Sequence, residues 1–126
     1  WDNGLYRKMA AEGHPLMVEA EEKEDWGVLP GAESAESVLA RVLPAFDRIV
    51  AAHPDETVVV VVHGGVIGCY LSDVTGSRPM AFVTADNASI NHVIVDSRRR
   101  TLRRFNDTGH LEGELSTETD PPAAAG

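Results

Sequence analysis

The sequence predicts an α/β fold, a three-layer α/β/α sandwich whose sheet is mostly parallel. The run Thr57–Val62 is short, β-branched and apolar at consecutive positions, which is typical of a parallel strand covered by helices on both faces. Helical apolar patterns precede and follow this run. Two strand-like segments near the C-terminus, separated by a turn, predict an antiparallel edge strand.

Composition narrows the class of protein. The chain has 126 residues, 43% of them hydrophobic, which is enough for one domain with a core. Its formal net charge of -9 opposes nonspecific binding to nucleic acid or anionic lipid, so neither nucleic acid nor a membrane is an expected partner. The one cysteine, Cys69, rules out a disulfide within the chain. With no secretion signal evident, this favours a cytoplasmic protein.

The N-terminal part reads as a short helix and an acidic loop. Leu5 and Met9 lie on one face of the expected helix, which should end at residues 13–15, a Gly-His-Pro sequence. The segment Glu19–Asp25 contains five acids and one lysine. We expect a solvated surface loop there; the alternative is a loop that caps a pocket.

Two longer helices are predicted on either side of the central strand. The first has Ser34 as its N-cap and ends near Ala52. The second covers Val66–Thr75 and is closed by Gly76. The first helix has the wide apolar stripe of a helix that packs on a sheet.

The C-terminal strands are expected at Ala88–Asp96 and Thr101–Asn106, joined by a turn. Five arginines lie between Arg98 and Arg104; we interpret them as a solvated hairpin edge, with an anionic partner as the alternative. Residues 113–126 are acidic and rich in proline and alanine, and are expected to form a disordered tail. Three strands are few for two layers of helices, so the sheet is expected to be incomplete in this chain.

A titratable histidine and two glycines follow the most hydrophobic segment directly. His63 stands at the carboxyl end of the predicted strand, and Gly64 and Gly65 open the next helix. In open α/β sheets, ligands bind beyond the carboxyl ends of the strands. Helix N-termini attract anions, glycine permits close approach, and imidazole can donate a hydrogen bond or a proton. The pattern indicates a site that handles a phosphoryl group; a histidine that only caps the strand is the alternative.

Other motif readings fit less well. The segment from Gly64 to Gly68 lacks the glycine spacing of a dinucleotide fingerprint and the lysine of a P-loop. His53, His63, His92 and His110 show no i, i+4 pair, so no metal site is expected.

Four stretches resemble, in the same order, motifs of the histidine phosphatase superfamily, the phosphoglycerate-mutase-like proteins. They are VVVVVHGGVIGCYLSDVTG, the helix PGAESAESVLARVLPAFDRI, the strand NASINHVIVD and the closing RFNDTGHL. The opening WDNG is similar to the family's WEG element, with Asp2 in place of glutamate. The resemblance covers about residues 1–111.

The resemblance implies roles for two residues and the absence of others. In the family, the nucleophilic histidine lies in an Arg-His-Gly motif on the first strand, a second arginine follows on a helix, and the acid glutamate usually precedes WEG. These 126 residues contain no Arg-His-Gly. By resemblance, His63 is the second pocket histidine, catalytic and phosphate-binding, and the amide of Gly64 binds phosphate. We expect residues 1–112 to be the C-terminal part of such a domain, with an upstream segment supplying the nucleophile in cis or in trans.

The leading functional hypothesis is therefore a phosphomonoester hydrolase that acts through phosphohistidine on a small phosphorylated substrate. A phosphatase is favoured over a mutase, and no metal or organic cofactor is implied. The alternative is a non-catalytic family member that binds a phosphorylated ligand or a protein partner. A plain nucleotide-binding module would need a base or ribose contact that the sequence does not offer. Because one strand edge would be unpaired, association of the chain as a homodimer is also considered.

Overall fold

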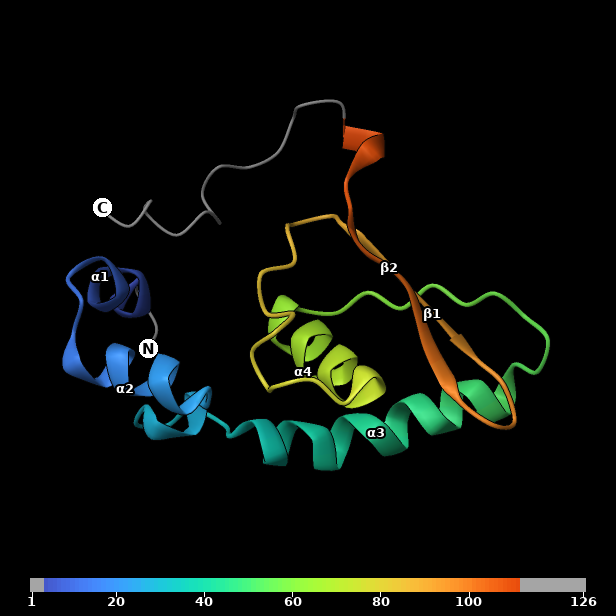
Figure 1. The fold of residues 1–126 in the computed structure, drawn as a ribbon, viewed down its shortest axis with the longest axis horizontal. Coiled ribbons are helices and arrows are strands. Elements are labelled where there is room, and N and C mark those ends of the chain that lie inside the picture. The colour runs from blue at the N-terminus through green and yellow to red at the C-terminus, as the bar shows by residue number, and fades with distance from the viewer. Residues whose placement is uncertain (1–3, 112–126) are drawn as a thin grey trace.

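The computed structural model describes residues 4–111, which form a mixed α/β fold (Figure 1). In chain order the elements are α1 (Leu5–Ala11), α2 (Pro15–Lys23), η1 (Trp26–Val28), α3 (Ala35–Ala52), α4 (Gly64–Thr75), β1 (Ile90–Val95), β2 (Arg100–Asp107) and η2 (Gly109–Leu111). In the described range the sheet has two antiparallel strands. No helix in this part of the chain is long and apolar enough to cross a membrane. The tail expected at residues 113–126 lies outside the described residues.

Two short helices, rather than one helix and a loop, form the N-terminal end. His14 caps α2 by accepting a hydrogen bond from the Leu16 amide at 3.2 Å, and Pro15 occupies the first helical position. The sequence interpretation treated this proline as a helix end, whereas proline is also favoured at a helix start. The prediction of a loop at Glu19–Asp25 is therefore wrong, because α2 continues to Lys23. The Lys23 side chain forms an ion pair with Glu19, one turn earlier in the helix, at 2.5 Å.

A small core cluster fixes these helices to the segment that follows. Its buried residues are Met9, Met17, Ala20 and Leu29. Tyr6 packs edge-on against Trp26, with ring centroids 5.8 Å apart. Asp25 then accepts hydrogen bonds from the amides of Gly27 and Ala35, at 2.8 and 3.2 Å, and so links this end to the start of α3.

The predictions for α3 and α4 are confirmed. Ser34 caps α3 by accepting a hydrogen bond from the Ser37 amide at 3.1 Å. At the other end of the pair, Gly76 closes α4 in the left-handed conformation, with φ of 67°. This is a backbone region that glycine enters without steric cost.

The main core joins α3, α4 and the hairpin through one aromatic side chain. Tyr70 of α4 is buried and stacks on Phe46 of α3, with centroids 4.1 Å apart and planes 19° from parallel. On β2, the Arg100 guanidinium lies 5.6 Å from the Tyr70 ring centroid and pairs with Asp73 at 2.5 Å. Burial raises the pKa of the Tyr70 phenol, and Arg100 partly opposes that rise.

The predicted antiparallel hairpin is also present. Val93 of β1 faces Leu102 of β2, and both pack with Phe105 against the main core. The opposite face is open: Ile90 is 53% exposed and Ile94 39% exposed.

The prediction of a central strand at Thr57–Val62 is wrong for the described part of the chain. Residues 57–62 belong to no hydrogen-bonded ladder in the described part of the chain. Val59 and Val61 are 86% and 92% exposed. A strand is defined by a neighbour that accepts and donates its backbone hydrogen bonds, and residues 4–111 supply none. The parallel sheet and the third layer of the predicted sandwich are therefore not seen among the described residues.

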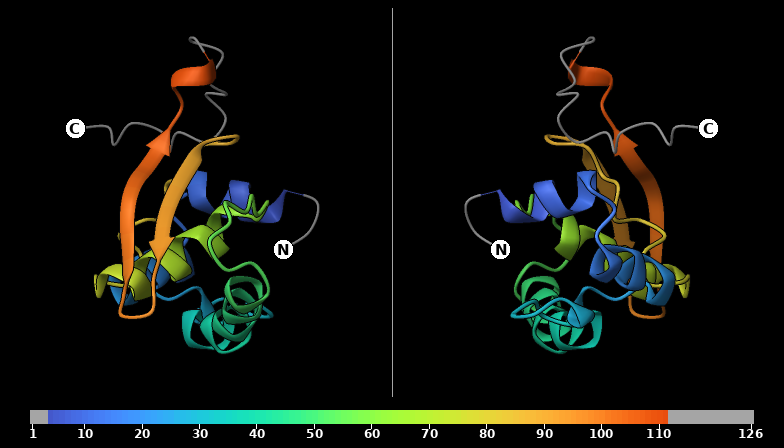
Figure 2. Two further views of the ribbon diagram at one scale, coloured as in Figure 1. Left: turned by 90° about the vertical axis from the view of Figure 1, so that its right-hand side faces the viewer. Right: turned by 90° about the vertical axis from the view of Figure 1, so that its left-hand side faces the viewer.

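The unpaired valine segment lies on one side of the hairpin. Figure 2 shows it beside β1 rather than beside β2, whose outer edge faces the other way. The segment connects the end of α3 to the start of α4, and His63 follows its last valine directly.

The long connection from α4 to β1 packs closely on the helix. A methyl group built on Gly68 would lie 2.8 Å from Val83 Cγ1 and 3.0 Å from Val83 Cα. Glycine is therefore required at this position so that the connection can approach the helix backbone.

This close approach predicts different effects on stability for alanine substitutions at two glycines of α4. Gly68→Ala should lower the free energy of unfolding by about 1–3 kcal/mol, because the new methyl overlaps Val83. Gly65→Ala meets no atom within 4 Å and should leave stability unchanged or raise it by up to about 1 kcal/mol. Urea denaturation of the two variants beside the unchanged chain measures both. Equal stabilities for the two variants would contradict the packing described here.

Candidate functional site

His63 is the N-cap residue of α4, and its side chain makes no capping hydrogen bond. Its backbone is extended (φ −73°, ψ 155°), and its carbonyl accepts hydrogen bonds from the amides of Val66 and Ile67, at 3.0 and 3.1 Å. The imidazole makes no capping hydrogen bond and is exposed. The extended valine segment thus ends by presenting an available imidazole beside a helix N-terminus.

The first two amides of α4 are also available. Within residues 4–111, no hydrogen-bond acceptor is found for the backbone N–H of Gly64 or Gly65. Neither glycine has a positive φ, and a methyl group on Gly64 would come no nearer than 3.9 Å to another residue. Neither backbone conformation nor packing therefore requires glycine at these two positions. What the glycines leave is open space above free N–H groups, which suits an anionic ligand.

The structure thus brings together the sequence-predicted residues His63 and Gly64, with Gly65 beside them. It also shows a neighbour that the sequence analysis missed. The carbonyl oxygen of Ala85 lies next to Gly64, and the following residue, Asp86, exchanges two hydrogen bonds with Asn106. The two partners are 20 residues apart, so no local pattern indicated the contact. The only available signal was that both lie beside or within segments that resemble family motifs.

Three further histidines considered as metal ligands lie on other elements. His53 pairs with Glu56 at 2.8 Å at the opposite end of the valine segment. His92 lies on β1 and His110 in η2. Among the residues that the structure describes, no group of three or more histidine, cysteine, aspartate or glutamate side chains is arranged to hold a metal ion.

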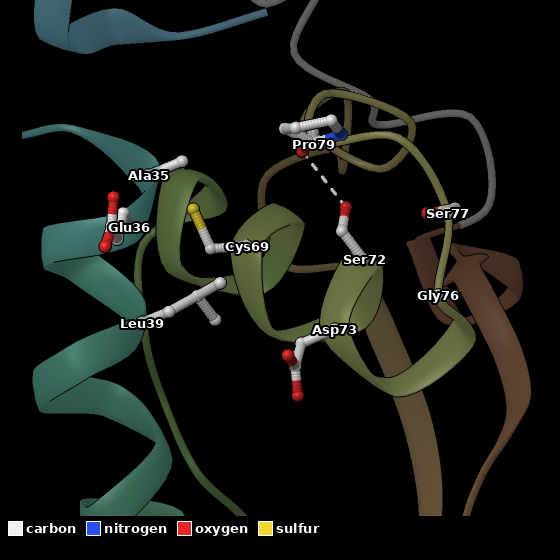
Figure 3. A pocket seen from close by; sticks show the side chains of 9 residues that line it. All are labelled: Ala35, Glu36, Leu39, Cys69, Ser72, Asp73, Gly76, Ser77 and Pro79. Atoms are coloured by element: carbon white, nitrogen blue, oxygen red, sulfur yellow. Dashed lines mark hydrogen bonds between the residues drawn. The ribbon is translucent and has the colours of Figure 1, made fainter.

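A cavity of about 410 Å³ lies between α3 and α4, apart from the α4 N-terminus (Figure 3). Its walls include Leu39 and Cys69, and carboxylates of Glu36 and Asp73. Ser72, also in the wall, donates a hydrogen bond to the Pro79 carbonyl at 3.0 Å. Neither His63 nor Gly64 lines the cavity, so it is separate from the site at the α4 N-terminus.

Cys69 is not a suitable nucleophile. The side chain is buried at 7% exposure, and burial raises the pKa of its thiol, with the charges of Asp25 and Glu33 adding to the rise. The thiolate is the reactive form of cysteine, so a thiol with a raised pKa in a buried place reacts slowly.

Comparison of the sequence with known protein families shows which family the chain belongs to. A profile of the histidine phosphatase superfamily (branch 1) matches residues 1–108. The chain belongs to this superfamily. The resemblance found in the sequence is therefore confirmed, and the site at the N-terminus of α4 lies within the matched range.

Two curated relatives are phosphatases by name. The chain is 30% identical to the metal-independent phosphoserine phosphatase of Arabidopsis thaliana over 110 residues, 86% of this chain and 45% of the relative. It is 25% identical to the uncharacterized phosphatase PhoE of Bacillus subtilis over 104 residues, 82% of this chain and 53% of the relative. The chain thus spans about half the length of the curated relatives it matches. No solved structure matches it significantly.

The burial of Cys69 gives a direct chemical test. At a pH of about 8, iodoacetamide should alkylate Cys69 at least about a hundredfold more slowly in the folded chain than in concentrated guanidinium chloride. As a control, a thiol introduced by Ala40→Cys, at an exposed position of α3, should react at nearly the unfolded rate. If Cys69 reacts as fast as the introduced thiol, its burial and raised pKa are wrong.

Proposed function

We propose that this chain is the phosphate-binding half of a phosphomonoester hydrolase that works through a phosphohistidine. The observation that carries the proposal is the grouping at the α4 N-terminus. There an exposed imidazole at His63 adjoins the Gly64 and Gly65 amides, for which residues 4–111 supply no acceptor, in a chain of the histidine phosphatase superfamily.

The proposed chemistry divides the work between this chain and a second segment. The Gly64 and Gly65 amides and the His63 imidazole would hold the phosphoryl oxygens, where negative charge develops during transfer. An upstream histidine would attack phosphorus, the ester bond would break, and an acid would protonate the leaving oxygen. Water would then cleave the phosphorus–nitrogen bond and release phosphate. We assign the nucleophile to a segment before Trp1, in cis or in trans, because the 126 residues contain no Arg-His-Gly motif.

The same segment would complete the fold. The valine segment at residues 57–62 has no strand partner among the described residues, and alternate valines are almost fully exposed. We propose that an upstream strand pairs with it, which would give the mostly parallel sheet and the three layers predicted from the sequence. On this view, residues 1–112 are one part of a larger domain. Pairing of two copies as a homodimer is another way to cover these edges.

The substrate is proposed to be a small phosphate monoester. One relative is named as a metal-independent phosphoserine phosphatase, and phosphoserine is such a monoester. In this mechanism the charge on phosphate is balanced by amides, imidazole and upstream arginines, so it needs no metal or organic cofactor. The cytoplasmic location expected from the single cysteine stays a prediction.

The second candidate is a non-catalytic family member that binds a phosphorylated ligand or partner. The absence of Arg-His-Gly from the 126 residues favours it if this chain acts alone. The coding sequence upstream of Trp1 distinguishes the two candidates. If it encodes Arg-His-Gly within a strand-like segment, the enzyme is supported; if it does not, the binding protein is supported.

The first functional prediction concerns the chain by itself. The 126 residues should not hydrolyse an aryl phosphate measurably, since attack on a phosphate monoester without the nucleophile is extremely slow. Adding the upstream segment in trans should restore turnover and raise the melting temperature, because the valine strand gains its partner. Turnover by the chain alone that disappears in His63→Ala would refute the division of labour; a melting temperature unaffected by the added segment would refute the sheet completion.

The second functional prediction separates the two histidines in the protein extended upstream. His63→Ala should slow turnover by about a hundredfold and weaken vanadate binding, because it removes a donor to the transition-state oxygens. It should still allow phosphate to label the upstream histidine, measured after a quench without acid. The control His53→Ala, which removes an exposed histidine at the far end of the valine segment, should change neither. Loss of all label in His63→Ala, with label kept when the upstream histidine is replaced, would make His63 the nucleophile.

A further inference from the structure

The connection between α4 and β1 forms a wall beside the free amides of α4. Its Val83 backbone approaches Gly68, and its Ala85 carbonyl oxygen comes to 3.9 Å from where a methyl group on Gly64 would lie. The connection therefore runs along the first turns of the helix toward its N-terminus. It brings a hydrogen-bond acceptor, the Ala85 carbonyl, close to donors that have no acceptor of their own among the described residues.

Two reciprocal hydrogen bonds hold the end of this wall. The Asp86 amide donates to Asn106 Oδ1 at 2.8 Å, and Asn106 Nδ2 donates to Asp86 Oδ2 at 2.9 Å. Both side chains are partly buried, so the bonds are shielded from competing water. Asn106 thus fixes Asp86 through both its backbone and its side chain, directly next to Ala85.

Asn106 is itself held in an uncommon conformation. Its φ is +56°, a region that asparagine enters more readily than most residues. The backbone N–H of Asn106 donates to Asn91 Oδ1 at 2.8 Å, and Asn91 Nδ2 donates to Ser89 Oγ at 3.2 Å. A single side chain here must offer an acceptor and a donor on a left-handed backbone, which asparagine does and aspartate, when ionised, does not.

We propose that Asn106 is a positioning residue for the phosphate site. By fixing Asp86, it holds the Ala85 carbonyl beside Gly64 without a hydrogen bond to the free N–H groups of α4. Without this restraint, the carbonyl can move onto those donors and accept the hydrogen bonds that a phosphate oxygen would accept. Asn106 therefore keeps the anion site open. The role in phosphate binding rests on the proposed function; the restraint on Ala85 does not.

A pair of substitutions tests the reciprocal bonds. Asn106→Asp places a carboxylate against the Asp86 carboxylate and should push the two apart. Combining it with Asp86→Asn restores an amide–carboxylate pair with donor and acceptor exchanged. Ser72→Ala is the matched control, because it removes the Ser72–Pro79 hydrogen bond at the other end of the same connection without touching Asn106. Asn106→Gly is a second variant, which keeps the left-handed backbone and removes both side-chain bonds.

The measurement is titration of each 126-residue chain with inorganic phosphate, followed by the NMR shifts of the Gly64 and Gly65 amides. Asn106→Asp and Asn106→Gly should weaken phosphate binding by about tenfold, and the double variant should return to within about threefold of the unchanged chain. Ser72→Ala should bind phosphate normally even if it melts earlier. Normal phosphate affinity in Asn106→Gly, or no recovery in the double variant, overturns the proposal.

A second readout needs no ligand. Hydrogen exchange of the Gly64 and Gly65 amides should slow by about tenfold in Asn106→Asp, since the Ala85 carbonyl then accepts from them, and should recover in the double variant. If the unchanged chain shows no phosphate-dependent shift, the proposed phosphate site fails and this exchange experiment alone decides the positioning role. Unchanged exchange in both Asn106 variants overturns it.

Discussion

The packing of Tyr70 is the interaction on which the rest of the described structure depends. Its ring is covered by Phe46 on one element and by Arg100 on another, so α3, α4 and β2 meet at one side chain. A stacked aromatic pair contributes about 0.5–1.5 kcal/mol beyond the burial of its area, and a guanidinium near a ring about 0.5–1 kcal/mol. Because Arg100 also forms an ion pair with Asp73 of α4, two contacts rather than one hold β2 against this helix.

This constraint determines where the N-terminus of α4 points. Once α4 is fixed between α3 and the hairpin, its first turn lies against the connection that returns to β1. The glycines along the helix then have two different uses. Gly68 admits the backbone of the connection, whereas Gly64 and Gly65 face space that no described residue fills. One helix therefore carries a packing surface and, one turn earlier, an open set of N–H groups.

Sequence reasoning succeeded where a short pattern determines the structure. The hydroxyl of Ser34, Gly76 after an apolar helix, and the turn between β1 and β2 each specify their element locally. The same reasoning failed at Pro15, because a proline that ends one helix and one that begins the next look alike in sequence. The valine strand was predicted from side chains alone, but strand pairing depends on a neighbour that the described residues do not contain.

The candidate site was predictable to the same extent. His63 and Gly64 follow the strand-like segment directly, so their place at a helix N-terminus could be expected. Asp86 and Asn106 come together only because the connection folds back on α4 and the hairpin is paired in one register. Contacts of that kind follow from the tertiary structure and leave no periodic trace in the chain.

The exposed valines also have a consequence for the chain in concentrated solution. Six residues from Thr57 to Val62 carry no charge and no proline, and five of them are valine, which is the composition of segments that stack into amyloid-like fibrils. Asp55 and Glu56 precede the run directly and supply repulsion between stacked copies, as charged gatekeepers do. Loss of these two charges should therefore accelerate fibril formation by this chain.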